Sequence, residues 1–210
     1  MNDENLNKLF DFCREIDKEK FIGRQTYLTG AARKENDAEH AWHAALMAIL
    51  LSEYSNEKID ILKTVTMILI HDIVEIDAGD TYAYDEIGKQ TQREREEKAA
   101  DRIFGILPKE KGEQLRDLWE EFERNDTPEA KFAHVMDNLQ PMMLNSHTDG
   151  KAWREHSVVL SKILDRNKTT KQGSEILWEY AFENIITPNV EKENIIDDSR
   201  QAATGNTQRG

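Results

Sequence analysis

Helical periodicity is the property of this sequence that most limits its fold. Nearly every long segment of the 210-residue chain repeats its apolar residues at the spacing of an α-helix, and no stretch alternates convincingly as a strand. Such helices must bury their apolar faces against one another, and the length suffices for one domain with a substantial core. We therefore predict an all-α fold, a single bundle of about seven to eight helices.

Local signals place the boundaries of these helices. Asn36 and Glu39 form a capping-box pattern, and Thr127 followed by Pro128 is a cap and first-turn signal. Pro141 is expected to kink or end the helix that begins there. Residues 20–35 are predicted to be irregular and residues 76–88 a loop. The expected helices cover about residues 3–19, 36–51, 57–75, 89–106, 108–125, 127–141, 151–167 and 173–187.

The two ends of the chain differ in what they are expected to bury. Apolar residues of the first helix share a stripe that is predicted to face the core: Leu6, Leu9, Phe10, Cys13 and Ile16. Cys13 is the single cysteine, which excludes an intrachain disulfide. Beyond residue 187 the chain is polar, so we predict a domain over residues 1–187 and a disordered tail over 188–210.

Charge limits the partners that the chain can bind. The net charge is -13, from 28 Lys+Arg against 41 Asp+Glu, which disfavours nucleic acid and anionic membranes. No apolar run reaches about 18 residues, and the first residues lack the cationic and apolar regions of a signal peptide. We therefore expect a cytoplasmic protein with a small-molecule partner.

Two histidines and two aspartates are set in apolar helical segments. His71-Asp72 ends the apolar run 67–70, where an unpaired carboxylate would be costly to bury. His40 lies in the first turn of another buried helix, and Asp137 lies among apolar neighbours on a third. Two imidazoles and two carboxylates make a plausible set of ligands for one divalent metal with open positions for water.

The histidine spacing bears on the number and kind of metal ions. No histidine lies between Asp72 and His134, so extra ligands for a two-metal site are not evident and one metal is favoured. Mixed nitrogen and oxygen ligands suit Mn, Co, Fe or Zn, and suit Mg less well. The other histidines are expected to be hydrogen-bonded structural residues: His43, His134, His147 and His156.

The full motif set resembles the HD-domain metal-dependent phosphohydrolases, an all-helical superfamily, and within it the 5′-deoxynucleotidases. The resemblance covers about residues 5–165. It implies an HD-type bundle, a nucleoside 5′-monophosphate substrate and a homodimer. The matching elements are Glu39-His40, which opens a helix; His71-Asp72-Ile73-Val74-Glu75, which closes the next; Gly79-Asp80; and Asp137 on a later helix.

The resemblance also implies roles for individual residues. Glu75 and Asp80 would be the acid-base pair, and Arg24 would hold the phosphate. Arg33 is a rival for the phosphate, or it pairs with a carboxylate and orients it. The metal ligands would be His40, His71, Asp72 and Asp137.

Two tyrosines near Asp80 are further candidates for contact with substrate. Tyr82 and Tyr84 follow Asp80 in the predicted loop and would stack on a base or sugar. Ordinary loop packing is the alternative for both.

Other functions remain open at the level of sequence. One is hydrolysis of another phosphoester on the same fold, such as ppGpp or a cyclic nucleotide. The ppGpp branch carries an acidic pair where this chain has Glu75 followed by Ile76, which counts against that branch. A non-catalytic metal-holding or ligand-sensing module is the other alternative, and it would need neither Glu75 nor Asp80.

Overall fold

The computed structural model describes residues 3–80 and 89–199, and this part of the chain is mostly helical. The all-α prediction is confirmed. The elements before the gap are α1 (Glu4–Glu15), η1 (Ile16–Phe21), β1 (Gly23–Tyr27), β2 (Lys34–Asn36), α2 (Asp37–Leu51), η2 (Ser52–Tyr54), α3 (Ile61–Ile70) and α4 (Glu75–Ala78). Those after it are α5 (Lys89–Phe104), α6 (Lys109–Arg124), α7 (Pro128–His147), α8 (Lys151–Glu155), α9 (Leu160–Arg166), α10 (Thr170–Gly173), α11 (Glu175–Ala181), η3 (Phe182–Ile186) and α12 (Thr187–Glu191).

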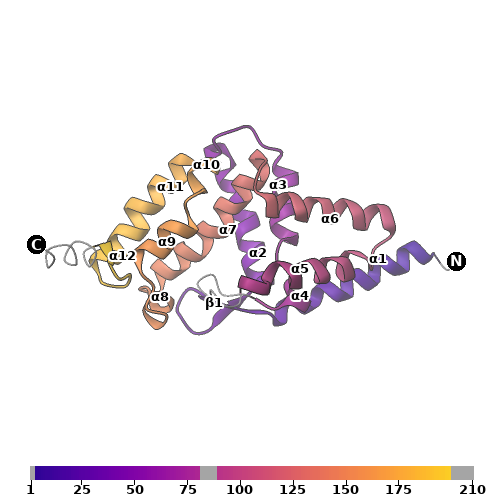
Figure 1. Cartoon of the computed structure of the whole chain (residues 1–210), viewed down its shortest axis with the longest axis horizontal. Helices are drawn as coiled ribbons and strands as arrows, with labels where there is room; N and C mark the ends of the chain where they lie inside the picture. The colour runs from indigo at the N-terminus through magenta and orange to yellow at the C-terminus, as the bar shows by residue number, and fades with distance from the viewer. Residues whose placement is uncertain (1–2, 81–88, 200–210) are drawn as a thin grey trace, which may run out of the picture.

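The long helix α7 is the centre of the bundle. It packs against α2, α3, α6 and α10, and it also contacts α8 and α11. Figure 1 shows α1, α4, α5 and α6 at the end nearer the N-terminus and α8 to α12 at the end nearer the C-terminus. Two apolar cores follow this division: one joins α2, α3, α7 and the C-terminal helices, and the other lies between α5, α6 and the end of α3.

A short hairpin replaces the irregular segment expected over residues 20–35. β1 pairs with β2 in antiparallel orientation, with Gly23 opposite Asn36 and Tyr27 opposite Lys34. Strands this short have no alternating pattern long enough to detect in a sequence. Asn36 ends the hairpin and caps α2 through the predicted capping box with Glu39, which is confirmed. The hairpin therefore fixes the start of α2 against β1.

The stripe predicted to face the core on the first helix is mostly exposed, so that prediction is wrong. Leu6 and Phe10 are exposed, and so is Cys13. Phe12, on another face of α1, is buried in the core next to α5 and α6 instead. The apolar spacing correctly indicated a helix, but a stripe does not by itself show which face a neighbour covers.

The predicted disordered tail begins too early. Residues 188–199 are packed on the bundle: Ile195 is buried, and Ile196 exchanges backbone hydrogen bonds with the Val158–Leu160 segment. The polar residues that suggested disorder are themselves paired, since the Asn194 side chain donates to that of Asn189 at 2.8 Å. Residues 200–210 lie outside the described part of the chain.

Helix α7 passes through Pro141 and does not end there. Thr127 caps its start as predicted, accepting a hydrogen bond from Ala130 N, with Pro128 at the first position. Pro141 removes one backbone donor, and packing on several sides outweighs that loss. Among the described residues no helix has the length and apolar character needed to cross a membrane.

Candidate metal centre and active site

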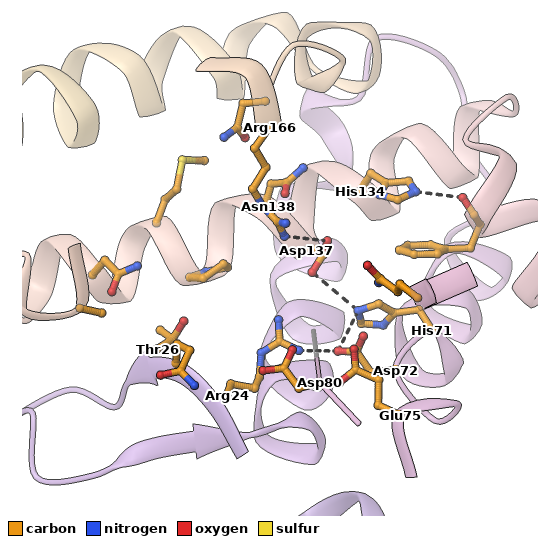
Figure 2. A pocket seen from close by; sticks show the side chains of 18 of the residues that line it. Arg24, Thr26, His71, Asp72, Glu75, Asp80, His134, Asp137, Asn138 and Arg166 are labelled. Atoms are coloured by element: carbon orange, nitrogen blue, oxygen red, sulfur yellow. Dashed lines mark hydrogen bonds and ion pairs between the residues drawn. The ribbon is translucent and has the colours of Figure 1, made fainter. Parts of the chain in front are cut away.

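A single cavity of about 290 Å³ brings together most of the residues predicted to form the site. It lies between the hairpin, the α3–α4 junction and α7 (Figure 2). Each of these elements supplies side chains that were singled out from the sequence. The predicted residues that line it are Arg24, His71, Asp72, Glu75, Asp80 and Asp137.

Three helices position the metal-binding candidates. His71 and Asp72 follow directly after Ile70, the last residue of α3, and both are buried. His40 lies in the first turn of α2 with no exposed surface, and Asp137 lies in the middle of α7. Because α2, α3 and α7 pack against one another, these four side chains meet at one point.

Hydrogen bonds on the far side of each imidazole fix its tautomer. His71 Nδ1 donates to the backbone oxygen of Ile68 at 2.7 Å. His40 Nδ1 donates to Oε1 of Gln140 at 2.8 Å. In a neutral imidazole the second nitrogen then carries a lone pair, so both Nε2 atoms are available as metal ligands.

Both Nε2 atoms point at carboxylate oxygens. Burial lowers the pKa of His71, but the charges of Asp72 and Asp137 outweigh burial and hold that pKa well above its usual value, so a metal ion would take the place of a proton on this ring. His40 Nε2 lies 3.1 Å from Oδ1 of Asp137, and His71 Nε2 lies 3.1 Å from Oδ2 of Asp72 and 3.6 Å from Oδ1 of Asp137. His40, His71 and Asp72 each offer a ligand atom, and these atoms lie within 4.8 Å of one another. Asp137 Oδ1 lies near the Nε2 atoms of both histidines. Figure 2 shows Asp137 on the other side of the His71 ring from Asp72.

The chemistry of this donor set fits a divalent cation. His71 Nε2 is buried and has no hydrogen-bond partner among the described residues, although two carboxylates stand beside it. Burial and the nearby charge of Arg24 lower the pKa of His40, which keeps that imidazole neutral. Two imidazole nitrogens and two carboxylates that converge in this way are typical ligands of a metal ion, so His40, His71, Asp72 and Asp137 would hold it.

Gln140 was not predicted from the sequence, yet it orients His40. It lies on α7 with no exposed surface, and its Nε2 donates to Oε2 of the buried Glu35 at 2.9 Å. Because Glu35 accepts from the amide nitrogen, the amide oxygen must face His40. Nothing in the sequence connects residues 35, 40 and 140, which are brought together by the packing of β2, α2 and α7.

Replacing Gln140 with leucine is expected to lower metal affinity by about 10- to 100-fold, because His40 loses the acceptor that fixes its tautomer. Calorimetric titration with Mn²⁺ measures this change. Gln114→Leu is the matched control, since Gln114 is exposed on α6 and its side chain accepts from Lys111. Equal Mn²⁺ affinity in Gln140→Leu and the unchanged chain would contradict the role of Gln140.

The two arginines proposed for phosphate are separated by the fold. Arg24 lines the cavity, and its Nη1 donates to Asp72 Oδ2 at 2.6 Å and to Asp37 Oδ1 at 3.2 Å. Arg33 lies outside the cavity and makes a bidentate pair with Glu39 at 2.6 and 2.8 Å. Arg33 therefore pairs with a carboxylate, as its alternative prediction stated, and the turn between β1 and β2 places it away from the cavity.

Glu75 and Asp80 line the same cavity, and both are strongly affected by burial. Desolvation raises the pKa of Glu75 to about 11, with further increases from the charges of Asp72, Asp37 and Asp80. Desolvation likewise raises the pKa of Asp80. Burial also raises the pKa of Asp37, to about 8. Glu75 therefore carries a proton at neutral pH unless a cation offsets these negative charges.

Asp37 and Arg166 are site residues that sequence reasoning missed. Asp37 is fully buried beside Arg24. Its place in the first turn of α2 gave the appearance of an ordinary helix start. Arg166 ends α9, and its Nη2 lies 3.7 Å from Oδ2 of Asp137. Figure 2 shows Arg24 and Arg166 approaching the site from opposite sides.

Two further histidines and two tyrosines were also singled out from the sequence. His134 is a hydrogen-bonded structural residue as expected, with Nε2 2.9 Å from the backbone oxygen of Phe122, and it also borders the cavity. His43 contacts the amide of Gln140. Tyr82 and Tyr84 lie outside the described residues.

Comparison with known proteins identifies the family. Residues 16–178 match the HD domain family, and the chain belongs to it. A predicted metal-dependent phosphohydrolase from Magnetospirillum magnetotacticum MS-1, known from its crystal structure, is 43% identical with a TM-score of 0.87. That match covers 91% of this chain and 95% of the other.

Curated relatives are more distant. The human 5′-deoxynucleotidase HDDC2 is 29% identical over 136 residues, which are 64% of this chain and 65% of the human protein. The Danio rerio protein of the same name is 27% identical over 143 residues, or 68% of this chain and 70% of that protein. The relation predicted from the motifs is therefore confirmed: this HD-domain chain is similar to 5′-deoxynucleotidases and to a predicted metal-dependent phosphohydrolase.

Proposed function

We propose that this chain is a metal-dependent phosphohydrolase that releases phosphate from nucleoside 5′-monophosphates. The observation that carries the proposal is the meeting of a metal donor set, the half-buried Arg24, the buried Glu75 and the half-buried Asp80 in one cavity. The names of the similar proteins support the same reaction class. The size of the cavity, about 290 Å³, is at the lower end of the range for small-molecule sites and suits a mononucleotide.

A bound divalent cation would polarise the phosphate and lower the pKa of an attacking water. His40, His71, Asp72 and Asp137 would hold it, and two imidazoles with two carboxylates favour Mn, Co, Fe or Zn over Mg. This donor set supports one metal ion.

Arg24, Glu75 and Asp80 would carry out the remaining steps. Arg24 is fixed by Asp72 and Asp37, so its guanidinium is already oriented to bind the phosphate oxygens. Glu75 would accept the proton of the attacking water, once positive charge beside Asp72 lowers its raised pKa. Asp80, whose pKa is also raised, would supply a proton to the leaving 5′ oxygen.

A larger phosphoester is a weaker candidate for the substrate. A substrate such as ppGpp carries two diphosphate groups, and the cavity lining holds several carboxylates that would repel the added charge. A purely sensory role is also disfavoured, because burying Glu75 and Asp80 raises their pKa values without any benefit to a structural metal site.

An assay of phosphate release from a panel of 5′-monophosphates with Mn²⁺, Co²⁺ and Mg²⁺ tests the proposal. We expect release from nucleoside monophosphates, with Mg²⁺ the poorest of the three. Cleavage of ppGpp alone would instead assign the chain to the alarmone hydrolases, and no release from any compound would favour a sensor. Metal analysis of the purified protein would identify the native ion.

We also propose a homodimer, supported by an apolar face on α2. Trp42, Leu46, Ile49 and Leu50 are exposed there, and no charged residue occurs between Glu39 and Glu53. Two copies of a chain with a net charge of -13 associate most easily where charge is absent. Sedimentation of the chain and of a Trp42→Glu variant tests this, with a monomer expected for the variant.

A further inference from the structure

The cavity extends beyond the metal donors into a neutral pocket. Along α7 the lining continues from Asp137 through Asn138, Pro141 and Met142 to Asn145, which share one face of the helix. Ala152 and Trp153 of α8 and Gln25 and Thr26 of β1 complete this end. None of these side chains beyond Asp137 carries a charge, whereas the opposite end of the cavity is lined by Glu96 and Glu123.

Asn145 is the residue in this neutral pocket whose hydrogen bonding is incomplete. Its side chain is 8% exposed, and its buried Oδ1 has no hydrogen-bond partner among the described residues. Asn167 lines the same cavity, but both polar atoms of its side chain are hydrogen-bonded. Its Nδ2 donates to Ile163 O, and its Oδ1 accepts from Thr170. A buried acceptor without a donor costs free energy in the folded protein, so its occurrence at a cavity wall indicates a ligand that supplies the donor.

The distance along α7 matches the dimensions of a nucleotide. Asn145 follows Asp137 by eight residues, which at 1.5 Å per residue places them about 12 Å apart along the axis. A nucleoside monophosphate has a comparable span from its phosphate to the far edge of its base. A phosphate held near Asp137 therefore places the base beside Asn145, with Met142 and Trp153 available for apolar contact with the ring.

We infer that this pocket binds the nucleobase and that Asn145 Oδ1 accepts a hydrogen bond from an exocyclic amino group of that base. The inference rests on the proposed function and adds a base preference to it. Adenine and cytosine present an amino group at the relevant edge, whereas hypoxanthine and uracil present a carbonyl oxygen in the same place. A carbonyl there would leave Oδ1 without a donor and would bring two acceptors together.

The test compares four substrates in two pairs. Deoxycytidine monophosphate is compared with deoxyuridine monophosphate, and deoxyadenosine monophosphate with deoxyinosine monophosphate. Each pair differs at this edge by an amino group against an oxygen. We expect kcat/KM to favour the amino member of each pair by about tenfold or more. Asn145→Leu should abolish the preference, while Asn145→Asp, which keeps an acceptor, should retain it.

Two controls separate the possible failures. Circular dichroism and Mn²⁺ titration show whether Asn145→Leu folds and keeps its metal centre, and a base-free ester such as p-nitrophenyl phosphate reports turnover in the parent chain without a base contact. Asn184→Leu is the matched substitution, because Asn184 is exposed and its side chain donates to Tyr180 O. Calorimetry that compares the affinity for deoxycytidine with the affinity for deoxyuridine gives a readout that is independent of turnover.

Equal kcat/KM within each pair, unchanged in Asn145→Leu, would overturn the base assignment and leave the proposed function intact. A preference for the carbonyl bases would also overturn it. Absence of phosphate release from every nucleotide, with the base-free ester still cleaved, would overturn the proposed function and the inference together.

Discussion

Replacing Asp72 with asparagine is expected to remove phosphate release and to lower metal affinity by more than about 100-fold, since loss of a residue that merely orients a ligand already costs 10- to 100-fold. Asp72 Oδ2 contacts both His71 and Arg24, so one substitution removes charge from the donor set and from the arginine that orients the phosphate. Asparagine keeps the shape of the side chain but loses its charge. Mn²⁺ titration by calorimetry, with phosphate release on the same preparation, measures both effects.

The Asp72→Asn result needs a control for folding, because Arg24 loses one of its two close partners. Asp37 still pairs with Arg24 at 3.2 Å, so the guanidinium is not left alone. Circular dichroism should show an unchanged helical fold. Asp165→Asn is the matched change, since Asp165 is exposed on α9 and pairs with Lys168. An Asp72→Asn protein that binds Mn²⁺ as tightly as the parent would refute the metal site.

Changing Glu75 to glutamine should lower kcat by about 10²- to 10⁴-fold, the usual contribution of a general base. Metal affinity should change little, because Glu75 belongs neither to the group of His40, His71 and Asp72 nor to the contacts that Asp137 makes with the histidines. Rates measured with saturating Mn²⁺ separate the loss of turnover from any loss of metal. Full activity in this variant would remove Glu75 from the mechanism.

The raised pKa of Glu75 also predicts the stability of that variant. A carboxyl group whose pKa is raised on folding is destabilising as pH increases above its ordinary value of 4.5, because folding then opposes ionisation. Glutamine cannot ionise, so metal-free Glu75→Gln should lose less stability than the parent between pH 5 and 8. Thermal melts across that range test this, with Glu113→Gln, an exposed position on α6, as the control.

The metal donors were predictable because their surroundings are chemically unfavourable. A histidine and an aspartate at the end of an apolar run, and an aspartate within an apolar helix, need a compensating partner. Arg24 was predictable as one of two alternatives, and the hairpin decides between them. These features are local in sequence, so they can be recognised without the fold.

The residues that support the donors were not predictable in the same way. Gln140 and Asp37 are ordinary polar residues on helices, and their roles arise from contacts across 100 positions to His40 and across 13 to Arg24. The same limit explains the error at the C-terminus, where Asn189 and Asn194 appear solvent-exposed in the sequence but satisfy one another inside the fold. Pairing between distant polar groups leaves no periodic signal.

The placement of Asp137 and Asn145 on one continuous helix has a consequence for substrate selection. A helix of this kind holds its residues at fixed separation, so the spacing between the proposed phosphate position and the proposed base pocket would not adapt to the ligand. Nucleoside diphosphates and triphosphates, whose terminal phosphate lies farther from the sugar, cannot satisfy both ends at once. The number of linked phosphates, and not charge alone, would then separate monophosphates from triphosphates.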